Sequence, residues 1–325
     1  MNAAEDFEKI VYWYRRFADH EAHGRSDLFE EWARGVADDR EVLDLLSELP
    51  RPKRQPNLLF ACSRLLGCPL SGYPDYRDWL VANWPAVLAE MRVRGTQTNE
   101  PRRCAVLLPL LAQIAGRFAL LEVGASAGLC LYPDRYSYSY DGRRLDPADG
   151  PSTVLLECAT TGNPPIPTAL PEIAWRAGID LNPLDLANPD DTTWLETLIW
   201  PEQQERRARI RAAMDIVRAD PPLIVRGDAI DDLPGLVARA PEDVPLVVVS
   251  SAAIVYLMPE PRERFIEYVR SLDATWISNE GAGIVPVAAA ALDGRTPPML
   301  GGMLLSLNES PKAFTGPHGD RLDWL

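Results

Sequence analysis

The first ninety or so residues place apolar side chains at the spacing of helices. A series that begins at Phe7 recurs every three or four residues, as one buried helix face does. Further series of this kind run through residues 28–36, 42–49 and 79–91. Ser26 precedes the first of these three and is expected as its N-cap. No stretch of this region alternates apolar and polar residues, so we expect residues 1–95 to form an all-helical cap.

From residue 96 onward, short apolar runs alternate with helix-like stretches. The runs predict strands at 118–123, 173–179, 222–225, 245–249 and 275–277. Helices are expected at 101–117, 201–218 and 262–272. Strands that alternate with helices indicate βαβ units and a mostly parallel sheet. Residues 96–325 are therefore expected to form an α/β domain, closed by an antiparallel hairpin of 303–307 and 321–325.

Three tyrosines alternate along another predicted strand, in an insertion expected at about 132–170. They are Tyr136, Tyr138 and Tyr140, and the Asp-Gly pair after them is a strong signal for a two-residue hairpin turn. Alternate residues of a strand share one face. That face either packs into the core or forms a lid that stacks on a substrate ring, and in the second case Tyr138 would bind the substrate.

The charge balance argues against nucleic acids and membranes as partners. The chain has 33 Lys and Arg against 47 Asp and Glu, which gives a net charge of −14 at pH 7. A negative field repels phosphate backbones and anionic lipids. The acidic start, MNAAEDFEK, does not resemble an export signal, and the most apolar stretch, 105–131, is interrupted by polar residues. We therefore expect a cytoplasmic protein that acts on a small molecule as a monomer or homodimer.

Cysteine and histidine usage argues against a metal site. None of the five cysteines forms a C-x-x-C pair, and their number is odd. This usage favours reduced thiols over a disulfide framework or a zinc ribbon. Only three histidines occur, so a histidine-rich site is excluded and no metal is expected.

The most informative segment is LEVGASAGL at 121–129. It places Gly124 and Gly128 in a predicted turn from a strand to a helix, with Glu122 at the strand end. Glycine lets the backbone approach a ligand closely, and the N–H groups at a helix start favour electron-rich atoms. An adenosine-containing cofactor would fit at such a turn, at the carboxyl ends of the strands.

Two later acids follow the next predicted strands. Asp180 comes after the second strand, where a carboxylate can accept both hydroxyls of a ribose, and Asp228 comes after the third, where it can accept from an adenine amino group. Asp180 lies 56 positions after Gly124 (180 − 124), beyond the ~20 of the compact dinucleotide fingerprint. Each acid alone could also be a surface or capping residue.

These motifs together resemble the class I S-adenosylmethionine-dependent methyltransferases over residues 96–325. The resemblance implies a Rossmann-like sheet with an antiparallel last strand, and S-adenosylmethionine as cofactor. Glu122, Gly124 and Gly128 would surround its methionine part, Asp180 the ribose, and Asp228 the adenine. The cofactor-binding residues it implies are Glu122, Gly124, Ala125, Ser126, Gly128, Asp180, Asp228, Ala229 and Ser250.

A closer resemblance extends over nearly the whole chain. Residues 96–100 (TQTNE), 121–129, 178–184, 225–232 and 278–281 resemble an uncharacterised bacterial family, the domain of unknown function numbered 2332. That family carries no established reaction. Two positions depart from the methyltransferase pattern: Ser126 replaces a middle glycine, and 249–253 (VSSAA) replaces an acidic or Asn-Pro-Pro substrate loop.

Methyl transfer needs a nucleophile in line with the methyl group, and often a base. The candidate catalytic residues are Glu100, Tyr256, Glu280 and His318, and the candidate substrate-binding residues are Asn99, Ser251, Asn279 and Tyr138. Glu280 follows an apolar run, and burial there would raise its pKa. Asn279 and Glu280 could instead cap turns, and His318 could be a surface loop residue.

Two alternatives compete with S-adenosylmethionine-dependent methyl transfer to a small molecule. Gly124-x-Ser126-x-Gly128 matches the nucleophile elbow of α/β-hydrolases, and Ser126, Asp228 and His318 follow the triad order of that fold. That elbow normally follows several strands, however, whereas the residues before this one have helical patterns. The other alternative is a non-catalytic protein that binds S-adenosylmethionine or S-adenosylhomocysteine, or a scaffold.

Overall fold

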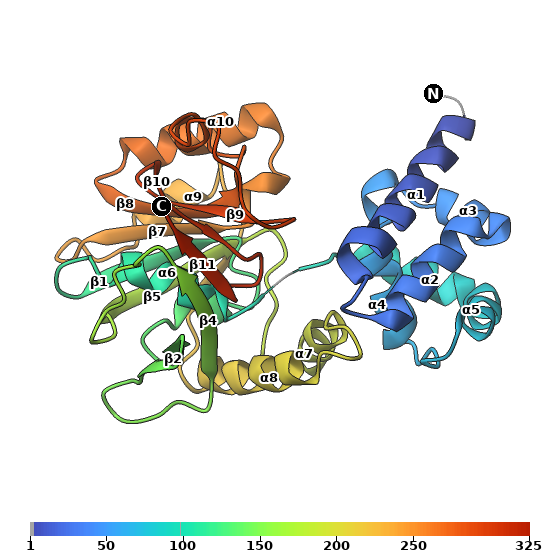
Figure 1. Cartoon of the computed structure of the whole chain (residues 1–325), viewed down its shortest axis with the longest axis horizontal. Coiled ribbons are helices and arrows are strands. Elements are labelled where there is room, and N and C mark those ends of the chain that lie inside the picture. The colour runs from blue at the N-terminus through green and yellow to red at the C-terminus, as the bar shows by residue number, and fades with distance from the viewer. Residues whose placement is uncertain (1–2, 98) are drawn as a thin grey trace. The chain divides into compact units, whose positions relative to one another are not determined.

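In the computed structural model the described residues are 3–97 and 99–325, and the chain divides into two compact units (Figure 1). Unit 1 comprises Met1–Thr98 and Pro189–Arg207, and unit 2 comprises Asn99–Asn188 and Ala208–Leu325. Thr98, part of the TQTNE segment, lies outside the described residues. Among the described residues, no helix is both long and apolar enough to cross a membrane.

Unit 1 is built of helices around an aromatic core. Its described residues as far as Val93 form helices and no strand, as the apolar spacing predicts. The helices are α1 (Ala3–Phe17), a π-helix (Ala18–Ala22), α2 (Asp27–Asp38), α3 (Arg40–Ser47), a 3-10 helix (Arg51–Lys53), α4 (Pro56–Leu65), α5 (Tyr73–Val93), α7 (Pro189–Thr197) and the start of α8 (Gln204–Ala219). The Ser26 hydroxyl accepts a hydrogen bond from Phe29 N at 3.1 Å, which confirms the predicted cap of α2. Trp32 stacks on Tyr76 with ring centroids 3.9 Å apart.

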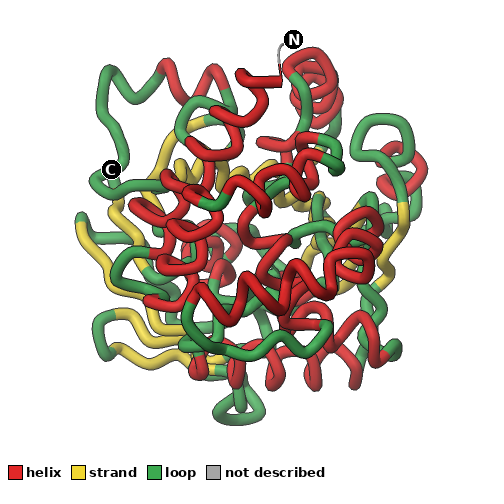
Figure 2. Tube along the Cα trace, turned by 90° about the vertical axis from the view of Figure 1, so that its right-hand side faces the viewer, coloured by secondary structure: helices red, strands yellow, loops and turns green. Residues whose placement is uncertain are grey.

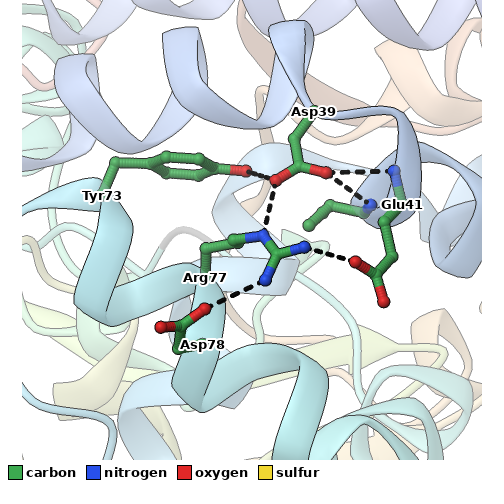
Figure 3. Close-up of polar contacts among 6 residues, drawn as sticks. Asp39, Glu41, Tyr73, Arg77 and Asp78 are labelled. Atoms are coloured by element: carbon green, nitrogen blue, oxygen red, sulfur yellow. Dashed lines mark hydrogen bonds and ion pairs between the residues drawn. The ribbon is translucent and has the colours of Figure 1, made fainter.

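A polar network joins the start of α3 to α5 (Figure 3). Asp39 caps α3, because one carboxylate oxygen accepts from Glu41 N at 3.0 Å and from Val42 N at 3.2 Å. Its other oxygen accepts from Tyr73 Oη at 3.2 Å and Arg77 Nε at 3.0 Å. Burial alone would raise the pKa of Asp39, but these hydrogen bonds outweigh burial and hold the pKa below its ordinary value.

Unit 2 contains a mixed sheet, whose strands are the yellow segments of Figure 2. Within the described residues its order is β3-β2-β4-β11-β10-β9-β8-β7-β1-β5-β6. The strands are β1 (Phe118–Val123), β2 (Ser137–Tyr140), β3 (Arg143–Leu145), β4 (Leu155–Thr161), β5 (Ile173–Asp180), β6 (Leu223–Arg226), β7 (Leu246–Ser251), β8 (Ala274–Gly281), β9 (Met303–Leu307), β10 (Ser310–Thr315) and β11 (Arg321–Trp324). The helices are α6 (Arg103–Leu111), most of α8, α9 (Leu233–Val237), α10 (Pro259–Ser271) and α11 (Pro286–Ala290). The predicted α/β class with a mostly parallel sheet is confirmed, because β6, β5, β1, β7 and β8 all run parallel.

The apolar runs predicted as strands supply one face of the core. Leu121 and Val123 of β1 and Val248 of β7 belong to a buried cluster that also contains Phe265 of α10. Successive side chains of a strand point to opposite faces. Glu122 therefore lies on the other face of β1.

The predicted pairing of the last two strands is wrong. β10 lies between β9 and β11 and pairs antiparallel with both, in a segment whose proline and glycine residues favour a loop. The register of β9 and β10 shifts between Pro311 and Ala313, and such a bulge is a place where a strand tolerates proline. The last three strands of the chain form a three-stranded antiparallel meander within the sheet.

The helix expected after the glycine turn is also not found. Only a three-residue 3-10 helix, Leu129–Leu131, follows the turn. Asn99 Oδ1 accepts from Leu129 N at 3.0 Å, and Tyr136 Oη donates to Leu129 O at 2.6 Å. Both backbone groups of Leu129 are thus bonded to side chains, and the chain continues into the tyrosine hairpin.

The tyrosine hairpin forms as predicted from β2 and β3, and its tyrosine face is packed. Tyr136, Tyr138 and Tyr140 are buried, and their hydroxyls donate to the backbone oxygens of Leu129, Pro133 and Ala105, at 2.6 Å in each case. The core-packing interpretation describes this face. Tyr138 is fully buried, so it presents no surface to a substrate.

Candidate functional site

The chain order of the parallel strands reverses between β1 and β7. From β1 the chain passes to β5 and β6 on one side, and it then returns to β7 and β8 on the other. In open α/β sheets such a reversal leaves a crevice at the carboxyl ends of the strands, where ligands bind. We call this part of unit 2 the switch edge, and it consists of residues 99–103, 122–131, 180–184, 250–256 and 279–281.

Side chains from two other segments hold the glycine turn in place. Asp180 Oδ2, at the end of β5, accepts from Ser126 N at 2.8 Å. Asn99 Nδ2 donates to Ala125 O at 2.9 Å, and Asn99 Oδ1 accepts from Leu129 N. The structure thus brings together Asn99, Ala125, Ser126 and Asp180, which the sequence analysis selected separately.

Glycine is required at the turn because neighbouring strand ends approach it closely. Gly124 has a φ of +77°, and a Cβ placed there would lie 2.6 Å from Cβ of Ala253, after β7. Gly128 has a φ of +75°. On the other side, a Cβ on Gly178 of β5 would lie 2.3 Å from Cβ of Ala125. Larger residues at these positions would push β5 or β7 away from the turn.

Two non-glycine residues of the switch edge have left-handed backbones. Ser126 has a φ of +50° and Ala252 a φ of +51°, one after β1 and the other after the adjacent β7. Such a conformation costs of order 1–3 kcal/mol for a residue with a Cβ. Strain of this kind is concentrated at functional sites, so the two residues support a site at this edge.

Three buried polar atoms of the switch edge have no hydrogen-bond partner within residues 3–97 and 99–325. They are Glu122 Oε2, Ser126 Oγ and Glu280 Oε2. Buried polar groups of native proteins are almost always hydrogen-bonded, to protein or to bound molecules. Their common place at the carboxyl ends of β1 and β8 indicates a site that takes up polar ligand atoms.

Glu122 has a buried carboxyl in an environment that disfavours its charged form. Burial raises its pKa well above the ordinary value, and the Cys130 thiol and the charge of Asp180 raise it further. The Arg103 guanidinium acts in the opposite direction. The net direction is upward, so the protonated form of this carboxyl persists to higher pH than that of a solvent-exposed glutamate.

Glu280 caps the turn that follows β7. Its Oε1 accepts from Ala253 N at 3.1 Å and from Ile254 N at 3.3 Å. Burial raises the pKa of Glu280 to about 7, although these hydrogen bonds and the charge of Arg103 lower it. The capping interpretation of Glu280 thus describes these contacts, and burial shifts its pKa in the direction expected.

Arg103 is a residue of the switch edge that the sequence analysis missed. It is buried, and its guanidinium donates to Ser251 O at 3.0 Å and to Pro317 O at 3.1 Å. It therefore joins the end of β7 to the loop before β11. The signal is present in the sequence, because Arg103 opens a helix in which every later residue is apolar, RCAVLLPLL.

Three other candidate residues, Ser250, Ser251 and Asn279, form hydrogen bonds to each other or to neighbouring side chains. The Ser250 hydroxyl accepts from Trp276 Nε1 at 3.3 Å. Asn279 Nδ2 donates to Ser251 Oγ at 3.2 Å, and Asn279 Oδ1 accepts from the Thr315 hydroxyl at 2.7 Å. Ser250 and Asn279 are fully buried, so these contacts fix the ends of β7 and β8.

Glu100 forms a buried ion pair. Its Oε1 lies 3.2 Å from Arg209 Nε on α8, and the same oxygen accepts from Arg102 N at 3.1 Å. The side chain of Glu100 is 0% exposed and that of Arg209 is 13% exposed. The pair anchors the segment that carries Asn99 over the glycine turn.

Asp228, Ala229, Tyr256 and His318 occupy the edges of this arrangement. Asp228 Oδ1 accepts from Ile230 N at 2.7 Å, so Asp228 caps its own turn, which contains the half-buried Ala229. Tyr256 is 80% exposed after β7. His318 is half-buried, and its backbone oxygen accepts from Arg102 Nε at 3.2 Å. Its loop therefore lies against the segment that begins α6.

Within the part of the chain that the structure describes, no group of three or more His, Cys, Asp or Glu side chains could hold a metal ion. The described cysteines are all free thiols.

Comparison with known proteins identifies the family. The family model described as "Uncharacterized protein conserved in bacteria (DUF2332)" matches residues 12–68 and 69–324. No curated protein and no solved structure matches the chain. The two matched ranges include unit 1 from the second half of α1 onward and the whole switch edge of unit 2. The chain therefore belongs to the bacterial family DUF2332.

Proposed function

We propose that the switch edge binds S-adenosylmethionine and that the protein transfers its methyl group to a small molecule. The observation that carries the proposal is the pair of buried atoms Glu122 Oε2 and Ser126 Oγ, which lack hydrogen-bond partners in the described chain and flank the glycine turn. A ligand that bears an ammonium group and hydroxyl groups would satisfy both. When bound, the sulfonium of this cofactor supplies a methyl group that is activated for transfer.

The position of Asp180 supports this cofactor. Its two oxygens accept from Ser126 N and Asn182 N, each at 2.8 Å, so the carboxylate is held beside the turn. It is half-buried at the carboxyl end of β5, beside the glycine turn, where a ribose would lie. Asp228 and Ser250 contribute less to the proposal, because Asp228 caps its own turn and Ser250 is bonded to Trp276.

The sheet order also supports the proposal. Counted along the chain, the five parallel strands β6-β5-β1-β7-β8 have the order 3-2-1-4-5, which is that of Rossmann-type sheets. The antiparallel β9 lies next to β8. In sheets of this order, nucleotide ligands lie across the point where the order reverses, and here that point is flanked by Gly124 and Ala253.

The direct test is calorimetric titration of the full chain with S-adenosylmethionine and S-adenosylhomocysteine, after mass spectrometry has excluded co-purified nucleoside. Binding at micromolar affinity supports the cofactor, and a search for methyl acceptors then follows. Binding without turnover on any acceptor would favour a non-catalytic sensor. No binding by protein free of nucleoside would exclude both.

Asp180→Asn tests the residue assignment. The amide keeps one acceptor oxygen for the turn but loses the charge that strengthens hydrogen bonds to ribose hydroxyls. Charge-assisted hydrogen bonds contribute about 1.5–3 kcal/mol, so we expect the dissociation constant for S-adenosylmethionine to rise by roughly 10- to 100-fold. Asp185→Asn is the matched control, because Asp185 is an exposed aspartate outside the switch edge whose Oδ1 accepts from Ala187 N of its own loop at 2.8 Å. Equal affinities of the two variants would contradict the assignment of Asp180.

A serine hydrolase is the second candidate, and the backbone of Ser126 favours it. Its φ of +50° resembles the strained turn of a nucleophile elbow. However, Ser126 Oγ has no hydrogen-bond partner among the described residues, so no base activates it in this structure. A fluorophosphonate probe that labels the wild type and spares Ser126→Ala would make hydrolysis the better proposal.

A further inference from the structure

The buried carboxyl of Glu122 lies at the end of β1 in the switch edge, where a cation bound beside it would favour its ionised form. It is 5% exposed, on the face of β1 opposite the apolar core, and its Oε2 has no hydrogen-bond partner in the described chain. The ionisable groups that act on it come from three neighbouring elements. They are Arg103 of α6, Cys130 of the 3-10 helix and Asp180 of β5, and Tyr136 before β2 is close enough for Glu122 to raise its pKa.

We propose that Glu122 holds a proton in the ligand-free protein and releases it to solvent when the positively charged part of S-adenosylmethionine binds at the switch edge. This inference rests on the proposed function. In the step, the carboxyl O–H bond breaks and the proton passes to the buffer, while the carboxylate stays in the site. The site thus loses the positive charge of the proton when it gains the positive charge of the ligand.

Two features of the structure favour this exchange. An isolated buried carboxylate is costly, so burial favours the neutral form of Glu122 in the free site. The Arg103 guanidinium is also buried near this carboxyl, and it would repel a second cation unless a negative charge formed close to both. Ionised Glu122 supplies that negative charge. Its Oε2 would then accept a hydrogen bond from the ammonium group of the ligand.

The exchange makes the switch edge selective for charge. Because one proton is released, the affinity for S-adenosylmethionine rises by up to tenfold per pH unit below the pKa of Glu122. A neutral nucleoside such as 5′-methylthioadenosine, which lacks both the ammonium and the sulfonium, gains nothing from the ionised carboxylate. Its affinity is therefore expected to stay level over the same pH range.

Calorimetry in two buffers of different ionisation enthalpy measures the protons released per ligand bound. At pH 6.5 we expect close to one proton released with S-adenosylmethionine and none with 5′-methylthioadenosine. In Glu122→Gln the release should disappear, and in Asp185→Asn, an exposed carboxyl outside the switch edge, it should persist. Proton release that persists in Glu122→Gln, or wild-type binding of S-adenosylmethionine without proton exchange, would overturn the inference. Neither result would contradict S-adenosylmethionine as the cofactor.

A second measurement needs no variant. Infrared difference spectra of the wild type should lose a protonated-carboxyl band and gain a carboxylate band when S-adenosylmethionine is added, but not when 5′-methylthioadenosine is added. Unchanged carboxyl bands on saturation with S-adenosylmethionine would overturn the inference. Failure of S-adenosylmethionine to bind at all would be a different result, because it removes the proposed function itself.

Discussion

At the scale of single residues, the switch edge is defined by charged side chains that are buried. Glu280 is 1% exposed and Arg103 is 7% exposed, at positions where parallel strands meet loops. The apolar run before Glu280 marks it in the sequence as a carboxyl whose pKa would rise on burial. It does not predict which turn the carboxyl caps, because Ala253 and Ile254 lie almost thirty positions earlier in the chain.

The raised pKa of Glu280 makes stability depend on pH. Its pKa of about 7 in the folded protein exceeds the ordinary 4.5, so the native state binds more protons than the unfolded state between these values. The stability that this carboxyl contributes is therefore complete below pH 4.5 and is lost as the pH rises through 7. A difference of 2.5 units (7 − 4.5) corresponds to about 3 kcal/mol.

Urea unfolding of the wild type and Glu280→Gln at pH 5 and pH 8 measures this effect. Glutamine cannot titrate, and all other carboxyls are common to both proteins. We expect the free energy of unfolding of the wild type, relative to the variant, to fall by about 2–3 kcal/mol from pH 5 to pH 8. If the wild type and the variant differed in free energy of unfolding by the same amount at pH 5 and at pH 8, Glu280 would ionise at its ordinary pKa.

Asp39 shows how a single residue can join two helices. It caps α3 and also accepts from Tyr73 and Arg77 of α5 (Figure 3). Loss of a cap costs about 1 kcal/mol, and the two stranded donors add to this, so Asp39→Ala should destabilise unit 1 by about 2 kcal/mol. Asp38→Ala is the control, because Asp38 is exposed in an ion pair with Arg15 and should change stability by less than about 0.5 kcal/mol. Thermal unfolding followed by circular dichroism compares them, and equal shifts of the two midpoints would contradict the role of Asp39.

At the scale of elements, the sequence predicts what local patterns determine. The five strands β1, β5, β6, β7 and β8 are apolar runs, and each is found close to its predicted place. β4, which pairs parallel with β2 and β11, is not predicted. β10 is missed because its pairing depends on β9 and β11, and not on a pattern within its own SPKAFT sequence. The helix after the glycine turn is overpredicted for the same reason, because Asn99, distant in sequence, binds Leu129 N. Long-range partners decide both outcomes.

The candidate site likewise has some features that the sequence predicts and others that depend on long-range contacts. Gly124, Gly128 and Asp180 are readable from the sequence, because a strand-end glycine turn and an acid after the next strand have local signatures. The links of Asn99 to the turn and of Arg103 to two distant loops are not readable, because they arise from tertiary packing.

At the scale of the whole molecule, unit 1 is discontinuous in sequence. Pro189–Arg207 belongs to it and contributes to its aromatic core. Trp200 lies 5.7 Å from both Phe17 and Phe29, measured between ring centroids. Arg64 Nη1 also donates to the backbone oxygens of Thr197 and Ile199, at 2.8 and 2.7 Å.

A chain that begins at Asn99 should therefore be poorly soluble. It would keep Trp194 and Trp200 of unit 1 without the helices that bury them, and such apolar surface favours aggregation. We expect aggregates in size-exclusion chromatography and strong binding of a hydrophobic dye.

The control for this prediction also lacks 189–207, with Asn188 joined to Ala208 by a short Gly-Ser linker. Because this chain retains only unit 2, it should elute as a discrete species. If the chain that begins at Asn99 were soluble and the control aggregated, the division into units would not describe how the protein folds.

The discontinuity of unit 1 also has a consequence for biosynthesis. Its first 98 residues leave the ribosome before the 109 further residues (207 − 98) that bring Pro189–Arg207 into reach. At about 5–20 residues per second, this delay lasts roughly 5–20 s. During that time Phe17 and Phe29 await Trp200 while the first strands of the sheet are still being made. We therefore expect the aromatic core of unit 1 to be completed only after residue 207 has emerged.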